Sequence, residues 1–268
     1  MYIPTGIQAR EAVHVLLLRE LNELGSGSAT TLKGGVNLRL FWGSVRYSED
    51  MDLDGAPEFS AAIRTRIRAT IEDGRLVRDL RLLGLRGIDP GEGPNKDTDT
   101  VFRYKFNVLG GGDVRYPTKV EVSFRPTHPS DVIEHGPADG SVAGRYLPQA
   151  RSLNVPHYGR IAATRQKLVA LSGRTIVQAR DVFDLHILGL HCTPTDWSKL
   201  AAQVESEILV RGLGRTLEIS YSEFEGKVVE FLSDEARSRF GSPTAWEEIQ
   251  LAVAEGIESV ISAQAGLP

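Results

Sequence analysis

The segment Arg46-Tyr-Ser-Glu-Asp-Met-Asp-Leu-Asp54 decides the fold, because acidic and apolar residues alternate along its second half. Alternation with a period of two is typical of a β-strand. On a strand, Asp50, Asp52 and Asp54 project from one face, and the two apolar residues between them point into the core. A divalent cation relieves the repulsion between such carboxylates, and oxygen ligands favour Mg²⁺ or Mn²⁺. We therefore expect a metal site at Asp50 and Asp52.

Two other interpretations of the acidic segment stay open from the residues alone. An exposed edge strand often carries charges that prevent aggregation. A calcium-binding loop is the other, because the acids and Gly55 match positions one, three, five and six of the EF-hand pattern. The twelfth position of that pattern is Ala61 instead of a glutamate, which argues against calcium.

Two further segments add the groups that a nucleotide site needs. Lys33-Gly34-Gly35 lies between a predicted strand and a predicted helix, where glycines let backbone N–H groups approach a phosphate. Residues 119–123 alternate like a second strand, on which Glu121 shares a face with Lys119 and Ser123. Glu121 is therefore a candidate third carboxylate.

Hydrophobic periodicity predicts the remaining elements. We expect helices over 7–24, 36–41 and 63–71, a short strand over 30–32, a loop over 87–99, an antiparallel strand pair over 101–109 and 119–125, and helices after Pro156. This is an α/β (α+β) protein with a mixed sheet flanked by helices. We expect an α/β lobe over residues 1–155 and a helical lobe over 156–268 that completes the active site.

Composition limits the partners and the compartment. Cys192 is the single cysteine, so no internal disulfide forms, and no apolar stretch is long enough to cross a membrane. We expect a cytoplasmic monomer. The net charge of −4 gives no global attraction to RNA, but seven arginines face three acidic residues between Arg64 and Arg86. They form either an RNA-binding patch, with Arg64, Arg68, Arg75 and Arg78 as candidates, or a solvated helix face.

Four segments, in this order, resemble the AbiEii/MenT nucleotidyltransferase toxins: residues 32–43, 46–54, 119–123 and 180–185. The resemblance implies the toxin of a toxin–antitoxin system, with a cognate antitoxin as partner. It also implies transfer of a nucleoside monophosphate from an NTP to RNA, at the 3′ acceptor end of tRNA in characterised members, which blocks translation.

The same resemblance implies roles for single residues. Asp50 and Asp52 would bind Mg²⁺ with help from Glu121, and Asp181 would be the remaining catalytic acid. The nucleotide would be bound by Lys33, Gly34, Gly35, Arg46, Ser48 and Lys167. Ser48 occupies the position that some relatives present for inhibitory phosphorylation. Gly173 separates Lys167 from Asp181, so we expect these two residues on different helices.

Two rival functions stay open. One keeps the chemistry but has a small molecule as the acceptor, as in antibiotic-modifying nucleotidyltransferases. The other is an inactive relative that binds nucleotide or RNA without turnover.

Overall fold

The computed structural model describes residues 5–23, 29–72, 74–147, 152–189 and 192–266. The chain forms two compact units. Unit 1 comprises residues 1–41, 47–129 and 133–158, and unit 2 comprises residues 42–46, 130–132 and 159–268. Two short segments from the first 158 residues therefore belong to the second unit.

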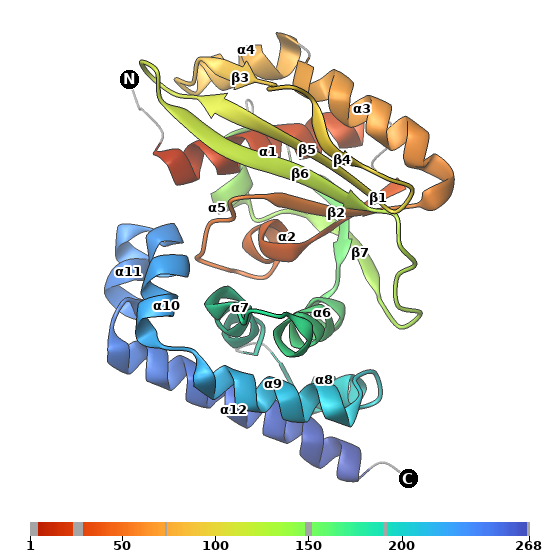
Figure 1. The fold of residues 1–268 in the computed structure, drawn as a ribbon, viewed down its shortest axis with the longest axis vertical. Coiled ribbons are helices and arrows are strands. Elements are labelled where there is room, and N and C mark those ends of the chain that lie inside the picture. The colour runs from red at the N-terminus through yellow and green to blue at the C-terminus, as the bar shows by residue number, and fades with distance from the viewer. Residues whose placement is uncertain (1–4, 24–28, 73, 148–151, 190–191, 267–268) are drawn as a thin grey trace. The chain divides into compact units, whose positions relative to one another are not determined.

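The described part of unit 1 is built on an eight-stranded mixed sheet (Figure 1). The strand order is β3-β5-β6-β2-β1-β8-β7, and β4 pairs with β5. Two pairs of neighbouring strands, β2 with β6 and β1 with β8, are parallel. The other pairs are antiparallel. The strands are β1 (Thr30–Lys33), β2 (Met51–Gly55), β3 (Gly87–Asp89), β4 (Pro94–Asp97), β5 (Val101–Leu109), β6 (Arg115–Ser123), β7 (Ile133–Pro137) and β8 (Asn154–Tyr158).

Helices cover the apolar side chains of this sheet. Every fourth residue of α3 is apolar and buried, at Ile63, Ile67 and Ile71, and they share one core with Phe102 and Tyr104 of β5. The Tyr104 hydroxyl donates a hydrogen bond to Glu72 Oε1 on α3 at 3.0 Å. The helical elements of unit 1 are α1 (Gly6–Glu23), α2 (Gly34–Phe41), η2 (Pro57–Phe59), α3 (Ser60–Glu72), α4 (Gly74–Leu82) and α5 (Gly140–Ala143).

The structure confirms the mixed α/β class and corrects two expectations about single segments. β2 lies between β1 and β6 in the sheet, so the edge-strand interpretation of the acids is wrong, and so is the calcium loop. The loop expected over 87–99 contains β3 and β4, which both pair with β5. Ladder hydrogen bonds to a long neighbouring strand order this Gly-rich and Pro-rich segment, and its composition does not reveal them.

Unit 2 is helical in its described part, apart from an isolated bridge between Arg46 and Leu232. Its core contains Phe183, Phe224 and Trp246, whose indole stacks on Phe224 at 4.3 Å. The elements are α6 (Arg160–Gly173), α7 (Ala179–Gly189), α8 (Pro194–Ala201), α9 (Ser206–Glu218), α10 (Tyr221–Lys227), η4 (Val229–Phe231), α11 (Asp234–Phe240) and α12 (Pro243–Ala265).

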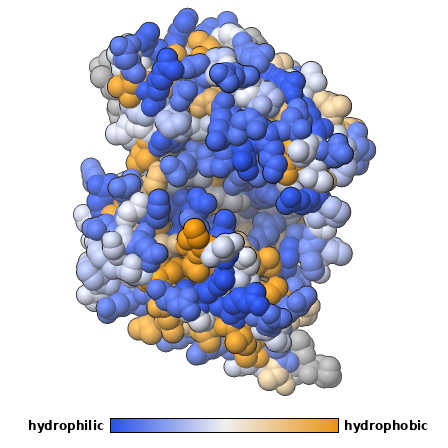
Figure 2. Space-filling view, in the orientation of Figure 1, coloured by the Kyte–Doolittle hydropathy of each residue, from blue (hydrophilic) through white to orange (hydrophobic). Residues whose placement is uncertain are grey.

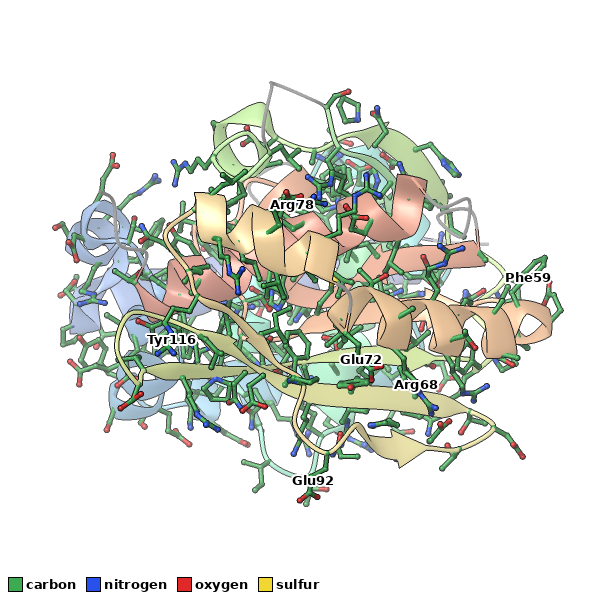
Figure 3. All side chains as sticks on the ribbon, turned by 90° about the horizontal axis from the view of Figure 1, so that it is seen from above. Phe59, Arg68, Glu72, Arg78, Glu92 and Tyr116 are labelled. Atoms are coloured by element: carbon green, nitrogen blue, oxygen red, sulfur yellow. The ribbon has the colours of Figure 1, made fainter. Side chains whose placement is uncertain are left out.

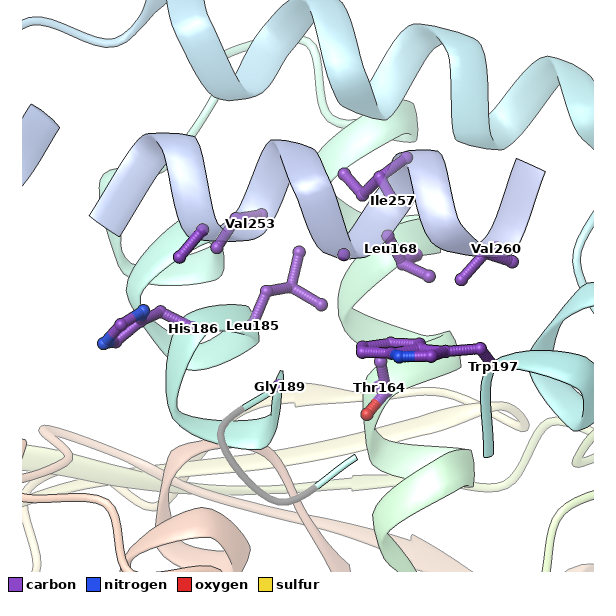
Figure 4. Close-up of a pocket in the computed structure, with 11 residues that line it drawn as sticks. Thr164, Leu168, Leu185, His186, Gly189, Trp197, Val253, Ile257 and Val260 are labelled. Atoms are coloured by element: carbon purple, nitrogen blue, oxygen red, sulfur yellow. The ribbon is translucent and has the colours of Figure 1, made fainter. Parts of the chain in front are cut away.

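An apolar cavity of about 150 Å³ lies among the helices of unit 2 (Figure 4). Leu168, Leu185, Trp197, Val253 and Ile257 contribute to its lining, and none of the residues lining it is acidic. It is therefore no candidate for the predicted metal chemistry. No described helix has the length and apolar character that crossing a membrane requires.

Candidate active site

The acidic strand β2 has a charged neighbour on each side. Asp52 lies directly opposite Glu121 of β6, in parallel register, and opposite Lys33 of β1, in antiparallel register. Residues directly opposite each other project from the same face of a sheet. Asp52 and Asp54 are partly buried while Met51 and Leu53 are fully buried, as the alternation predicted. The register therefore brings Asp52 and Glu121 together.

The turn from β1 into α2 approaches Asp52 closely. Gly34 has a φ of +68°, a left-handed conformation that favours glycine. A Cβ atom at this position would lie 2.8 Å from Asp52 Oδ2, so a side chain here would force that carboxylate to move. Because α2 begins at Gly34, its unpaired backbone N–H groups start beside that carboxylate. The glycine turn therefore lies beside Asp52, and its binding of a phosphate stays a prediction.

Asp50 precedes β2 and is held by its neighbours. Lys119 Nζ lies 2.7 Å from Asp50 Oδ2, and the Ser48 hydroxyl donates to the Asp50 carbonyl oxygen at 2.9 Å. The inhibitory phosphorylation of Ser48 stays a prediction.

A buried hydrogen-bond chain supports the same segment. The Thr118 hydroxyl donates to the Glu49 carbonyl oxygen at 2.7 Å, and His14 Nε2 lies 2.9 Å from that hydroxyl oxygen. His14 Nε2 must therefore carry the proton and donate to Thr118. Burial, only partly opposed by the charge of Asp50, lowers the pKa of His14 to about 4. His14 is thus neutral at pH 7, and its chain of bonds fixes the backbone next to Asp50.

The other two acids of this face also have partners. Arg103 Nε lies 2.5 Å from Glu121 Oε2. Asp54 forms an ion pair with Lys33 and accepts a hydrogen bond from the Tyr158 hydroxyl at 2.7 Å. Asp54, to which the sequence assigned no role, therefore ties β2 to β1 and β8.

The charges around Asp52 act on it in both directions. Burial raises its pKa, the positive charges of Lys33 and Lys119 lower it, and the negative charges of Glu121 and Asp50 raise it again, with a net increase. A carboxylate whose ionised form is disfavoured by burial and by other carboxylates gains from a nearby cation.

These carboxylates fit a hard divalent cation by their chemistry. Asp50, Asp52 and Glu121 offer oxygen atoms only, which are the ligands that Mg²⁺ prefers. No three His, Cys, Asp or Glu side chains are arranged as a complete metal-binding group among the described residues. Magnesium in nucleotide enzymes is commonly held by one or two carboxylates, with substrate phosphates and water as the other ligands. A pair such as Asp50 and Asp52 meets that requirement.

Unit 2 contains a network of five charged side chains around two buried carboxylates. Asp184, which is fully buried, accepts three hydrogen bonds from Arg46, at 2.9 to 3.2 Å. Lys167 Nζ lies 2.7 Å from Asp184 and 3.1 Å from Asp181. Arg174 Nε lies 2.7 Å from Asp181, which is also fully buried. The predicted residues Lys167, Asp181 and Arg46 are therefore brought together.

The predicted site residues thus form two sets, one in each unit. Gly34, Ser48, Asp50, Asp52 and Glu121 lie in unit 1, and the charged network lies in unit 2. The sequence analysis assigned no role to the partners of these sets, which are His14, Arg103, Lys119, Tyr158, Arg174 and Asp184. Two of them could have been found from the sequence, because Lys119 alternates with Glu121 and Asp184 stands in the motif 180–185.

Three of the four arginines predicted to bind RNA have acidic partners. Arg64 and Arg68 both form ion pairs with Asp97, at 2.9 and 2.5 Å. Arg75 lies 3.3 Å from Glu20. Figure 3 shows Arg68 pointing from α3 toward the strands, and Arg78 on α4. Their RNA-binding role stays a prediction.

A mixed sheet with a glycine turn beside a central acidic strand defines a nucleotidyltransferase fold, and solved structures share it. JHP933 of Helicobacter pylori has a TM-score of 0.61 and 20% identity, with 99% of this chain and 96% of that chain covered. MenT4, a nucleotidyltransferase toxin of Mycobacterium tuberculosis H37Rv, has a TM-score of 0.59 and 15% identity, with 96% and 84% covered. At these identities the likeness shows the fold alone.

The family follows from the sequence of most of the chain. Residues 16–253 match the family model described as nucleotidyl transferase AbiEii toxin, type IV TA system. The chain belongs to this family of nucleotidyltransferase toxins, which act on NTP substrates and have cognate antitoxins. A search of curated proteins found no match.

Proposed function

We propose that the toxin transfers a nucleoside monophosphate from an NTP to the 3′-hydroxyl of RNA, at the acceptor end of tRNA. The observation that carries the proposal is the register of Asp52 opposite Glu121, beside the turn at Gly34. Carboxylates that can hold Mg²⁺ and unpaired backbone N–H groups that can bind phosphate therefore lie at one place, which suits a metal-bound triphosphate.

The chain's own residues have distinct tasks in this reaction. Asp50 and Asp52, with Glu121, hold Mg²⁺, which when bound neutralises phosphate charge and lowers the pKa of the attacking hydroxyl. Lys33 and the backbone amides of Gly34 and Gly35 bind the triphosphate. The 3′-oxygen attacks the α-phosphorus, and the bond to the bridging oxygen of the pyrophosphate breaks.

The unit 2 network supplies the remaining groups of the proposal. Lys167 contacts the nucleotide phosphates. Asp181 is fully buried and paired with Lys167 and Arg174, so it positions Lys167, and the proton of the acceptor hydroxyl passes to solvent. Both side chains are preorganised, because Asp184 and Arg174 fix them at 2.7 Å.

The test is nucleotide transfer by the wild type and by Asp52→Asn, measured with each labelled NTP and unfractionated tRNA on a denaturing gel. We expect a loss of about a thousandfold, since metal-bound charge stabilisation is worth several kcal/mol. Thermal unfolding followed by circular dichroism should hardly change. Asp113→Asn, which alters a fully exposed carboxylate, is the matched control and should retain activity.

Full transfer by a folded Asp52→Asn variant would show that the acidic strand is not the metal site. Labelling of an aminoglycoside instead of RNA would move the protein to the small-molecule class. Absence of any turnover by the wild type would favour the inactive relative.

A further inference from the structure

Charged residues form one continuous row across five strands of unit 1. Lys96 of β4 lies opposite Arg103 of β5, Arg103 opposite Glu121 of β6, Glu121 opposite Asp52 of β2, and Asp52 opposite Lys33 of β1. Because directly opposite residues share a face, all five side chains project from the same side of the sheet. The two acids lie in the middle of the row, with cations at both ends.

A second row repeats the positive end. Lys105 of β5 lies directly opposite Lys119 of β6, whose ammonium group is paired with Asp50. Like charges directly opposite each other destabilise an antiparallel pair. The same repulsion occurs between Lys96 and Arg103 in the first row. Each of these two pairs lowers the stability of the folded state, and a bound anion would reduce the repulsion within them.

The positive charges of this region are only partly neutralised. Glu121 pairs with Arg103, and Asp50 pairs with Lys119. Lys96 and Lys105 are exposed, and neither has an ion-pair partner among the residues that the structure describes. Figure 2 shows hydrophilic side chains gathered over β5 and β6. We call these four cations, Lys96, Arg103, Lys105 and Lys119, the basic strand face.

The spacing of the cations suits a ligand with several phosphates that extends to Asp52. Neighbouring strands lie about 4.8 Å apart, so Arg103 and Lys96 lie about 10 and about 14 Å from Asp52 along the row. A ligand with one phosphate would reach only part of this span. A ligand with several phosphates in series would cover it and end at the carboxylates.

The arginines of α3 are poorer candidates for the same task. Arg64 and Arg68 share Asp97, and their guanidinium groups lie over Phe124 and Phe102, 4.6 and 5.5 Å from the ring centres. A polyanion that binds them must displace Asp97. Lys96 and Lys105 need give up no ion pair with a described residue.

We propose that the basic strand face binds the phosphates of single-stranded RNA, whose 3′ end reaches the carboxylates of β2 and β6. The inference rests on the proposed function, because it supplies the path of the acceptor strand to the reacting atoms. It places the RNA contact on strands β4, β5 and β6 rather than on the arginine-rich helices.

The test measures binding apart from transfer. A labelled single-stranded oligoribonucleotide with a free 3′-hydroxyl is titrated with the wild type and with Lys96→Glu/Lys105→Glu over a range of salt concentrations. Loss of two phosphate contacts should reduce the slope of log K against log salt by about 1.4, and weaken binding about tenfold or more at physiological salt. Thermal unfolding checks that the variant is folded.

The matched control reverses two exposed charges of unit 2 that have no assigned role, in Lys199→Glu/Lys227→Glu. We expect its affinity and salt slope to equal those of the wild type. Unchanged binding by the strand variant, or an equal loss in this control, would overturn the inference. The proposed function can fail separately, because it is decided by whether the wild type labels RNA at all.

Discussion

Gly34 combines a backbone requirement with a chemical one. Its φ of +68° is left-handed, and its missing side chain leaves room for Asp52 Oδ2, 2.8 Å from where a Cβ would be. Gly43 shares the first feature and lacks the second, because its φ is +69° and no atom lies within 4 Å of the corresponding position. Comparing substitutions at the two glycines therefore distinguishes the cost of backbone strain from the cost of a clash with Asp52.

The change Gly34→Ala should lower transfer far more than it lowers stability. Left-handed backbone costs an alanine about 1 to 2 kcal/mol at either position, but only at Gly34 must the Asp52 carboxylate also move. We expect Gly43→Ala to show the same loss of unfolding free energy with nearly normal transfer. Urea unfolding and the tRNA labelling assay measure the two effects. Equal activity of the two variants would contradict the role given to Gly34.

Individual residues of the site differ in how visible they are in the sequence. Asp50, Asp52 and Glu121 stand out because a two-residue period fixes which side chains share a face. Alternation also places Lys119 beside Glu121, but Arg103 becomes a candidate only once the register of β6 against β5 is known. Register joins residues that are distant in the chain, so local pattern does not specify it.

At the scale of elements, ion pairs connect α6 with α7, and the hydrophobic periodicity of the sequence does not reveal them. Asp184 lies on the buried side of α7 between Arg46 and Lys167. Burial alone would raise its pKa, but the charges of Arg46 and Lys167 lower it below the ordinary value. The folded state thus binds fewer protons at this residue than the unfolded state does. The resulting stability is present above the unfolded pKa of about 3.9 and is lost as pH falls through the folded pKa.

Asp184→Asn should destabilise the protein by about 3 to 5 kcal/mol at pH 7, since it leaves two buried cations without this carboxylate. The difference from the wild type should begin to shrink below about pH 4, where the unfolded carboxylate gains a proton, and should vanish only below the lower folded pKa. Urea unfolding at several pH values measures it, with the exposed change Asp113→Asn as the control. A difference that stays constant down to pH 2 would show that the charge of Asp184 is not what matters.

Elements with a strong local pattern were predictable, and those ordered by their neighbours were not. The Ile63–Ile67–Ile71 spacing predicts α3, and the break at Gly173 predicts the separate helices of Lys167 and Asp181, which α6 and α7 confirm. β7 and β8 escaped prediction, as did β3 and β4 within the expected loop. Pro137 and Pro156 interrupt the β pattern of β7 and β8, and pairing with neighbouring strands orders them.

At the scale of the whole molecule, unit 2 is discontinuous in sequence. Residues 42–46 and 130–132 belong to it, although they come from the first 158 residues. Each contributes one charged partner to a helix of that unit. Arg46 pairs with Asp184, and Asp131 accepts three hydrogen bonds from Arg165, at 2.8 to 3.1 Å. The chain cannot be cut near residue 158 without separating both pairs.

The assignment of residues 130–132 to unit 2 can be tested through the pair of Asp131 and Arg165. The change Arg165→Met is made in the full chain and in the fragment 159–268. In the full chain the change leaves Asp131, whose side chain is 3% exposed, without its partner, and should cost about 3 to 5 kcal/mol. In the fragment 159–268 Asp131 is absent, so the same change should cost little or be stabilising. Urea unfolding followed by circular dichroism compares the two. If the fragment does not fold, a double-mutant cycle with Asp131→Asn in the full chain should show the same dependence of one residue on the other. Equal costs in both contexts, or no coupling in the cycle, would mean that the segment 130–132 is no part of the folded helical unit.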